Sequence, residues 1–290
     1  MPLLKRHKIL LGIILNAGGK PTKTELMKWI FLLKKETILK NDNSFYDFVP
    51  YEYGPFSFTL YRDLAELIEL GYLEKDGFEI NSRFLNPIRD IYQEIPKSIR
   101  ADIDKIIRYY SRLDLASLID HVYDKYPWFA HRSKLKPTSR NYSEEKINVL
   151  YTIGYEGKSI DSFLQYLIKF NIRLLVDVRN NPVSRKYGFS KSSLSRLCND
   201  VDVEYIHFPD LGVPSSLRSS LETPEDYQNL LNKYENEILP QLEDKRKQAE
   251  QCILEKSSAL VCFEADVRNC HRGRLAKALA QATGQTIKHL

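Results

Sequence analysis

The sequence predicts an α/β protein, with a parallel-sheet domain (147–290) preceded by a winged-helix domain (1–95) and a helical, basic connector (96–146). The length of 290 residues favours two domains, at roughly 100–200 residues each. From residue 149 onward, segments of strand character alternate with helical segments, which is typical of a parallel sheet covered on both faces. Before residue 80, three helical segments are followed by a hairpin signal, the order found in a winged helix.

The composition excludes several classes of protein. With 43% hydrophobic and 28% charged residues, the chain resembles a globular protein and not a disordered or fibrous one. No apolar run approaches the roughly 18–20 residues of a membrane-spanning helix, so we expect no membrane partner. The net charge of +5 is too small to identify a nucleic-acid-binding protein. Four cysteines are too few for a secreted protein stapled by disulfides.

The first residues carry a basic group, Lys5 to Lys8, followed by an apolar run from Ile9 to Leu15. This order is similar to that of a signal peptide. The run is at the short limit for such a peptide, and it fits the first helix of the domain that follows. We therefore predict a helix over 4–16 and a cytoplasmic protein.

The remaining N-terminal elements follow from capping and turn residues. Thr22 or Thr24 caps a second helix, and Ser57 caps a third. An extended segment over 45–53 separates these helices, and an Asp-Gly turn predicts a hairpin over 72–80. Acidic residues match basic ones on the third helix, whereas a helix that follows phosphates should be richer in Lys and Arg. Contact with DNA and contact with a protein, including a second copy in a homodimer, both stay open.

The connector is predicted to be helical over 96–126, with an apolar stripe that suits packing between domains or in a dimer. Basic residues then accompany an aromatic one. Such a group can grip a DNA or RNA backbone and stack on a base. The alternative interpretation is a solvated linker. The candidate nucleic-acid-binding residues are Trp128, Arg132, Lys134 and Lys136.

The C-terminal domain is predicted to contain five strands, and ligands of such sheets bind beyond the carboxyl ends of the strands. That rule selects the polar residues that follow each strand. Asp177 and Arg179 have an alternative interpretation, which is an internal pair that holds the loop after the strand in place. The strands are 149–153, 173–178, 203–208, 259–263 and 286–290, and the helices are 159–170, 224–236, 238–256 and 273–283. The candidate ligand-binding residues are Gly154, Tyr155, Glu156, Arg179, Pro182, Ser184, Arg185 and Arg272.

The residues after the fourth strand allow three chemistries. Cys270 at a helix start beside His271 and Arg272 could be a nucleophile, because a helix N-terminus and cations lower a thiol pKa. Cys262, Cys270 and His271 could bind zinc, but their spacing is irregular and no fourth ligand is evident. The helix start with its arginines could hold an anion, with Glu264 as acid or base. We favour the anion site, and we expect no metal and no cofactor.

Two resemblances to known families add to these predictions. The motifs T-I-G-Y-E-G, L-L-V-D-V-R-N-N-P-V-S-R, Y-I-H-F-P-D-L-G, C-F-E-A-D and C-H-R resemble the prokaryotic family called domain of unknown function 488. The resemblance implies a Rossmann-like domain and adds Thr152 to the signature positions. The segment F-V-P-Y-E-Y-G-P-F-S-F-T-L-Y-R-D-L resembles the Panacea antitoxin family (domain of unknown function 4065), which implies a regulatory or protein-neutralising module.

The function expected from these observations is binding of a phosphorylated ligand, a nucleotide or a nucleic-acid base. Asp177, Glu264, Cys270 and His271 are the candidate catalytic residues. Two carboxylates facing one pocket would suit hydrolysis or transfer at an N-glycosidic bond. The fusion of such a domain to a winged helix suggests work on nucleic acids or nucleotides, in prokaryotic defence or DNA metabolism. The alternative function is that of a non-catalytic DNA-binding or antitoxin-like module.

Overall fold

The computed structural model describes residues 2–18, 20–75, 78–136, 145–218 and 223–290. The chain divides into two compact units, Met1–Tyr142 and Ser143–Leu290. Each unit has its own hydrophobic core. The fold of each unit is described separately below.

The three helices predicted at the start of the N-terminal unit are present, and the second and third begin at predicted capping residues. They are α1 (Lys5–Ala17), α2 (Lys23–Glu36) and α3 (Phe58–Glu69). The Thr22 hydroxyl accepts a hydrogen bond from the Glu25 amide at 3.2 Å, and Glu25 accepts one from the Thr22 amide at 2.8 Å. This capping box satisfies two of the amides that a helix start leaves unpaired. Ser57 caps α3 through the Leu60 amide.

The strands of the N-terminal unit differ from the prediction. The segment predicted as extended folds back as a hairpin of β1 (Val49–Tyr51) and β2 (Gly54–Phe56), and Gly54 takes a φ of +87° at its turn. Within the described part of the hairpin predicted over 72–80, the pairing is an antiparallel bridge between Leu73 and Ile80. Its Asp-Gly turn lies outside the described residues. The winged helix therefore stays a prediction.

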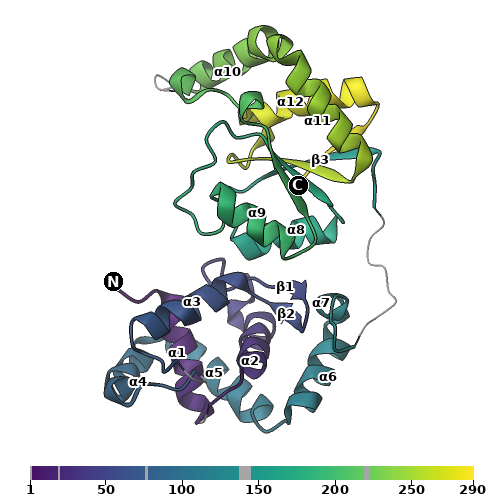
Figure 1. Ribbon diagram of the computed structural model, residues 1–290. Helices are drawn as coiled ribbons and strands as arrows, with labels where there is room; N and C mark the ends of the chain where they lie inside the picture. The colour runs from purple at the N-terminus through teal and green to yellow at the C-terminus, as the bar shows by residue number, and fades with distance from the viewer. Residues whose placement is uncertain (1, 19, 76–77, 137–144, 219–222) are drawn as a thin grey trace. The chain divides into compact units, whose positions relative to one another are not determined.

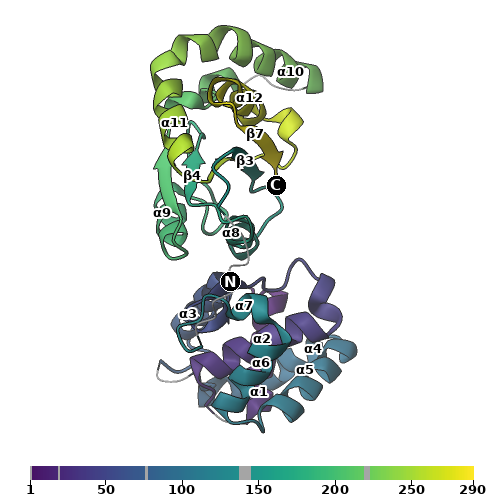
Figure 2. The same ribbon diagram turned by 90° about the vertical axis from the view of Figure 1, so that its right-hand side faces the viewer.

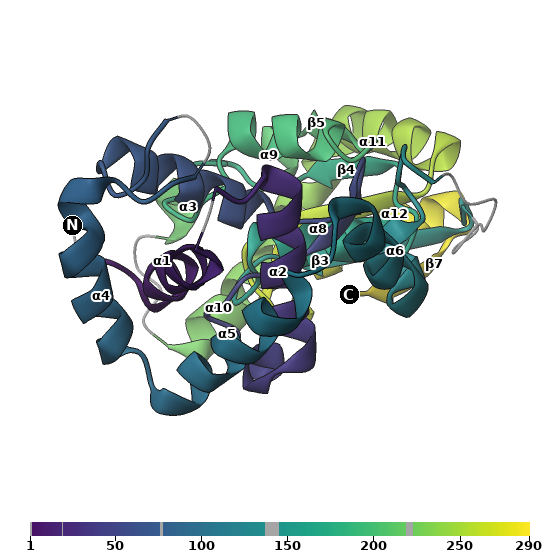
Figure 3. The ribbon, with the colours of Figure 1, turned by 90° about the horizontal axis from the view of Figure 1, so that it is seen from below.

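The helical region predicted as a connector belongs to the N-terminal unit. It contains α5 (Lys97–Tyr110) and α6 (Leu115–Lys125). Two helices that were not predicted flank it, α4 (Leu85–Glu94) and the short α7 (Pro127–Ala130). Figure 3 shows α1 with α2, α4 and α5 around it. Apolar side chains of α5 and α6 complete this core. The structure thus divides the chain near residue 142, and the predicted boundary at 95 lies inside the first unit, because α5 and α6 pack against α1 and α2.

The C-terminal unit is built on a five-stranded parallel sheet in the order β5-β4-β6-β3-β7. This confirms the predicted parallel α/β architecture. Figures 1 and 2 show α8 and α9 on one face of the sheet and α11 and α12 on the other. Helix α9 had no counterpart in the prediction. The strands are β3 (Val149–Gly154), β4 (Leu174–Asp177), β5 (Glu204–His207), β6 (Ser258–Cys262) and β7 (Thr286–His289). The helices are α8 (Ile160–Lys169), α9 (Lys191–Asn199), α10 (Pro224–Lys233), α11 (Glu243–Glu255) and α12 (His271–Thr283).

The register of the sheet places the candidate residues together at the carboxyl ends of the strands. Gly154 pairs with Cys262, and Asp177 pairs with His207 on one side and Val261 on the other. Strands β3, β4, β5 and β6 therefore terminate side by side, at nearly the same height in the sheet. Among the described residues, no helix is both long enough and apolar enough to cross a membrane.

Candidate functional site

Asp177 and Arg179 form a buried ion pair at the end of β4. The Arg179 Nε donates to Asp177 Oδ1 at 2.9 Å and Nη2 donates to Oδ2 at 2.5 Å. The Tyr205 hydroxyl also donates to Oδ2, at 2.6 Å. Although burial alone lowers the pKa of Arg179, the hydrogen bonds and charge of Asp177 raise it above its ordinary value. Asp177 has no exposed surface, so this geometry supports the internal pair and not an acid or base open to a ligand.

The remaining groups of Arg179 fix the loop that follows β4. Its Nη1 donates to the Phe189 carbonyl at 2.7 Å and to the Tyr155 hydroxyl at 3.2 Å. The rings of Tyr155 and Phe189 stack with centroids 4.3 Å apart. Both rings are buried. Tyr155 therefore belongs to the framework around the Asp177–Arg179 pair.

Other predicted residues of this loop serve its own backbone. The Lys186 amide donates to the Ser184 hydroxyl at 3.1 Å, and the Lys191 amide donates to the Pro182 carbonyl at 3.0 Å. Arg185 is exposed. Of the predicted residues in this loop, Arg185 is thus the one whose side chain is open to a ligand.

Gly154 allows the close approach of another part of the chain. A Cβ built on Gly154 would lie 1.8 Å from the Glu264 carbonyl oxygen. The guanidinium of Arg272 donates to that carbonyl and, at 3.0 Å, to the Ala265 carbonyl. Glu156 accepts from the Ala265 amide at 2.9 Å. These contacts hold the Glu264–Ala265 backbone against β3, and Arg272 is only 1% exposed, so this arginine also serves the framework.

Four chemistry-bearing side chains meet where β6 ends and α12 begins. The Cys270 thiol donates to Glu264 Oε2 at 3.0 Å, and Cys262 Sγ lies 3.8 Å from His271 Nδ1. Burial and the neighbouring Cys262 raise the pKa of the Cys270 thiol well above its usual value. Burial alone would raise the pKa of Glu264, but hydrogen bonds from the Cys270 thiol and the Glu264 amide hold it below the ordinary value. A neutral, buried thiol is a poor nucleophile, so the geometry does not favour Cys270 in that role.

Thr152 lies inside the sheet and not at its edge. It is fully buried, and its hydroxyl lies 2.8 Å from Nδ1 of His289 at the end of β7. His289 was missed in the sequence analysis. The rule that ligands bind beyond strand ends could have selected it, because the last strand was predicted.

An open groove of about 690 Å³ lies beside these strand ends. Arg268, Arg274 and Lys277 line it, against a single lining carboxylate, Asp266. Arg268 pairs with Asp266 at 2.7 Å, and Arg274 pairs with Glu235 at 2.8 Å. Lys277 is exposed and makes no ion pair within the described part of the chain. The full lining is Gln228, Asp266, Val267, Arg268, Asn269, Gly273, Arg274, Lys277 and His289.

Positive side chains near this groove act electrostatically on His289, which lines it. Burial first, and then the positive charges of Arg272 and Lys277, lower the pKa of His289. A surface that disfavours a further positive charge favours an anion for the same electrostatic reason. Lys277 and His289 were both absent from the predicted site.

The predicted nucleic-acid-binding residues of the N-terminal unit are engaged within that unit. Lys134 pairs with Glu52, and Lys136 pairs with Asp120. The Trp128 ring packs edge-on against Phe129, with centroids 4.8 Å apart. Arg132 also has an interaction partner. This pairing gives little free positive charge for a nucleic-acid backbone.

The third helix of the predicted winged helix, α3, is also held within its own unit. Asp63 of α3 is fully buried and accepts hydrogen bonds from Arg6 at 2.5 Å and from Tyr46 at 3.1 Å. Arg62 donates to the same carboxylate at 2.7 Å. Contact of this helix with DNA stays a prediction.

Comparison with known proteins gives one match. Residues 159–279 match the sequence model of the family described as "Domain of unknown function DUF488". This stretch runs from α8 into α12 and includes the Asp177–Arg179 pair and the Cys262–His271 segment. No curated protein and no solved structure matches the chain. The resemblance of the N-terminal residues to the Panacea antitoxin family stays a prediction.

Proposed function

We propose that the C-terminal unit binds a phosphorylated ligand, a nucleotide, in the groove beside β6 and β7. The observation that carries the proposal is the excess of positive side chains in this groove: Arg268, Arg274 and Lys277 against Asp266. Its volume of about 690 Å³ falls in the range of small-molecule sites, roughly 300–1,000 Å³.

The position of the groove also suits phosphate. Gly273 lies in the first turn of α12, where backbone amides and the helix dipole favour a negative charge. Arginine can hold a phosphate through two parallel hydrogen bonds. Lys277 adds a charge that no ion pair within the described residues engages. The amides of Gln228 and Asn269 offer donors and acceptors for a base or a ribose.

The proposal is limited to binding. Hydrolysis at an N-glycosidic bond by paired carboxylates would need a second acid beside Glu264. The predicted partner, Asp177, is buried and engaged by Arg179 and Tyr205. Recognition of the phosphate group is therefore the function that this geometry supports.

The test is calorimetric titration of the full chain with inorganic phosphate, AMP, ATP and a short single-stranded oligonucleotide at low salt. We expect ATP to bind more tightly than phosphate, and Lys277→Gln to weaken ATP binding by roughly tenfold, which corresponds to about 1.4 kcal/mol. Binding should weaken as salt rises, because the contact is electrostatic. Tighter binding of the oligonucleotide would identify a nucleotide within a strand as the ligand.

The matched control is Lys247→Gln. Lys247 is an exposed lysine of α11 that pairs with Glu243 and is absent from the groove lining. This variant should bind ATP as the parent does. The proposal fails if no phosphate compound binds at low salt, or if the variants at 247 and 277 behave alike.

A further inference from the structure

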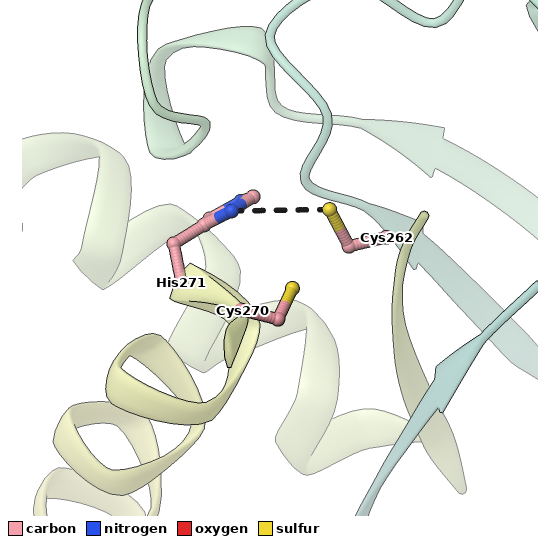
Figure 4. A group of neighbouring side chains, drawn as sticks. All are labelled: Cys262, Cys270 and His271. Carbon is pink, nitrogen blue, oxygen red and sulfur yellow. Dashed lines mark hydrogen bonds between the residues drawn. The ribbon is translucent and has the colours of Figure 1, made fainter. Parts of the chain in front are cut away.

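The end of β6 and the start of α12 bring three metal-ligand side chains together. Cys262 is the last residue of β6, Cys270 stands at the N-cap position of α12 and His271 is the first residue of that helix. One donor atom from each lies within 4.8 Å of the others. Figure 4 shows both sulfur atoms and the imidazole pointing toward a common space. The three side chains belong to residues that are only 1–2% exposed.

The imidazole is oriented as a metal ligand. Nε2 of His271 lies 2.9 Å from the Val178 carbonyl oxygen, which can only accept a hydrogen bond. Nε2 therefore carries the hydrogen, and the lone pair is on Nδ1, which faces Cys262 Sγ at 3.8 Å. Metal-binding histidines commonly donate their second ring N–H to a carbonyl in this way, which fixes the tautomer and the ring plane.

The spacing of the donors is close to that of a tetrahedral zinc site. Bonds of about 2.3 Å to sulfur and about 2.0 Å to nitrogen place neighbouring donor atoms roughly 3.5–3.8 Å apart. The 3.8 Å between Cys262 Sγ and His271 Nδ1 matches this separation without rearrangement.

Glu264 is the carboxylate next to this cluster, although its oxygens are not within 4.8 Å of all three donor atoms. Its Oε2 lies 3.0 Å from Cys270 Sγ. Arg272 donates to the Glu264 carbonyl, so a positive charge is close to the cluster. Two thiolates and one carboxylate carry three negative charges, one more than the two positive charges of a divalent cation. The guanidinium of Arg272 offsets this excess.

We propose that Cys262, Cys270 and His271 bind one Zn²⁺, and that the Glu264 carboxylate turns toward them to complete a closed, four-coordinate structural site. Sulfur and imidazole donors in tetrahedral arrangement select zinc over the oxygen-preferring Mg²⁺ and Ca²⁺. On binding, the two thiols lose their protons to solvent and form zinc–sulfur bonds, with no change in oxidation state. The ion joins the two ends of the 263–269 loop, which carries Arg268 and Asn269 of the groove.

The first experiment measures metal bound to the full chain after purification without chelator. We expect one zinc per chain by mass spectrometry of the metal, and a thiolate-to-cobalt charge-transfer band after replacement by Co²⁺. Cys262→Ser and Cys270→Ser should each reduce bound zinc to a small fraction and abolish the cobalt band. Cys252→Ser is the matched control, because Cys252 on α11 is a free cysteine outside the cluster. Its zinc content should stay unchanged.

A second measurement uses the unchanged chain, so that a variant that does not fold cannot decide the question. At a urea concentration that makes these buried thiols reactive in the metal-free chain, zinc should protect Cys262 and Cys270 from a thiol-alkylating reagent and leave Cys252 reactive, as read by peptide mass spectrometry. The proposal is overturned if the purified chain takes up neither zinc nor cobalt, or if zinc leaves the alkylation of Cys262 and Cys270 unchanged. Neither measurement depends on the groove, so the zinc site and the phosphate site can fail independently.

Discussion

At the scale of single residues, burial decides the role of Asp177. Replacing it by Asn would leave the guanidinium of Arg179 buried without its counter-charge. Breaking a buried pair in this way costs about 3–5 kcal/mol. We expect Asp177→Asn to lower the stability of the C-terminal unit by that amount, measured by hydrogen exchange of peptides from β4 and β6.

The control for this prediction is Tyr205→Phe. This variant removes one hydrogen bond to the same carboxylate and keeps the ion pair. It should cost only about 1 kcal/mol. Equal stability of the Asn variant and the parent chain would show that Asp177 does not hold the framework.

The sequence was enough to predict where the candidate site lies in the fold, but not what each of its residues does. The hydrophobic pattern shows where each strand ends. Because Gly154, Asp177 and Glu264 each stand at or just after a strand end, the pattern predicted that they lie in one region. Whether a polar group faces a ligand or an internal partner depends on neighbours from other strands. Tyr205 reaches Asp177 from β5, and the Glu264 backbone reaches Gly154 from the loop after β6. No local pattern contains these contacts.

At the scale of elements, α2 carries a buried lysine that joins it to the β1–β2 hairpin and α6. Lys28 is 1% exposed, donates to the Tyr53 carbonyl and lies 5.7 Å from the ring centre of Tyr123. Burial lowers the pKa of Lys28 from 10.5 to about 7. Between these values the unfolded chain binds more protons on Lys28 than the folded chain does. The free energy of unfolding should therefore rise with pH, by at most about 1.4 kcal/mol per pH unit.

Lys28→Met should remove this contribution to the pH dependence, and Lys40→Met, at an exposed position, should leave it in place. Tryptophan fluorescence during urea unfolding is a suitable measurement, because Trp29 and Trp128 both belong to the N-terminal unit. The same slope between pH 7 and 10 in the Lys28→Met variant and the parent would contradict the prediction.

Elements with a strong local signal could be predicted, and weaker ones could not. Thr22 and Ser57 identify the starts of α2 and α3, and the apolar runs identify β3, β4 and β6. Helix α9 is short and presents only Leu194, Leu197 and Cys198 to the core, which is too few for a clear periodic pattern. The β1–β2 hairpin depends on a tight turn within an aromatic-rich segment, where strand character is continuous.

At the scale of the whole molecule, the amphipathic stripe of the predicted connector indicated a buried face but not what it packs against. In the structure, Ile103 of α5 and Leu118 of α6 complete the N-terminal core. The C-terminal core is closed by α11 and α12 against the sheet, through residues such as Ile253 and Leu275. Each core is thus assembled from one continuous part of the chain.

This division predicts that residues 1–142 and 143–290 fold when they are produced separately. Each fragment should show one cooperative thermal transition by circular dichroism. The tryptophan-detected transition of the full chain should coincide with that of fragment 1–142, because both tryptophans lie in it. A disordered fragment 1–142, or one that melts far below the tryptophan transition of the full chain, would show that its core needs the other unit. Fragment 1–95, the predicted winged helix alone, should fail to fold, because it lacks α5 and α6 and would expose the apolar faces of α1 and α2 that they cover.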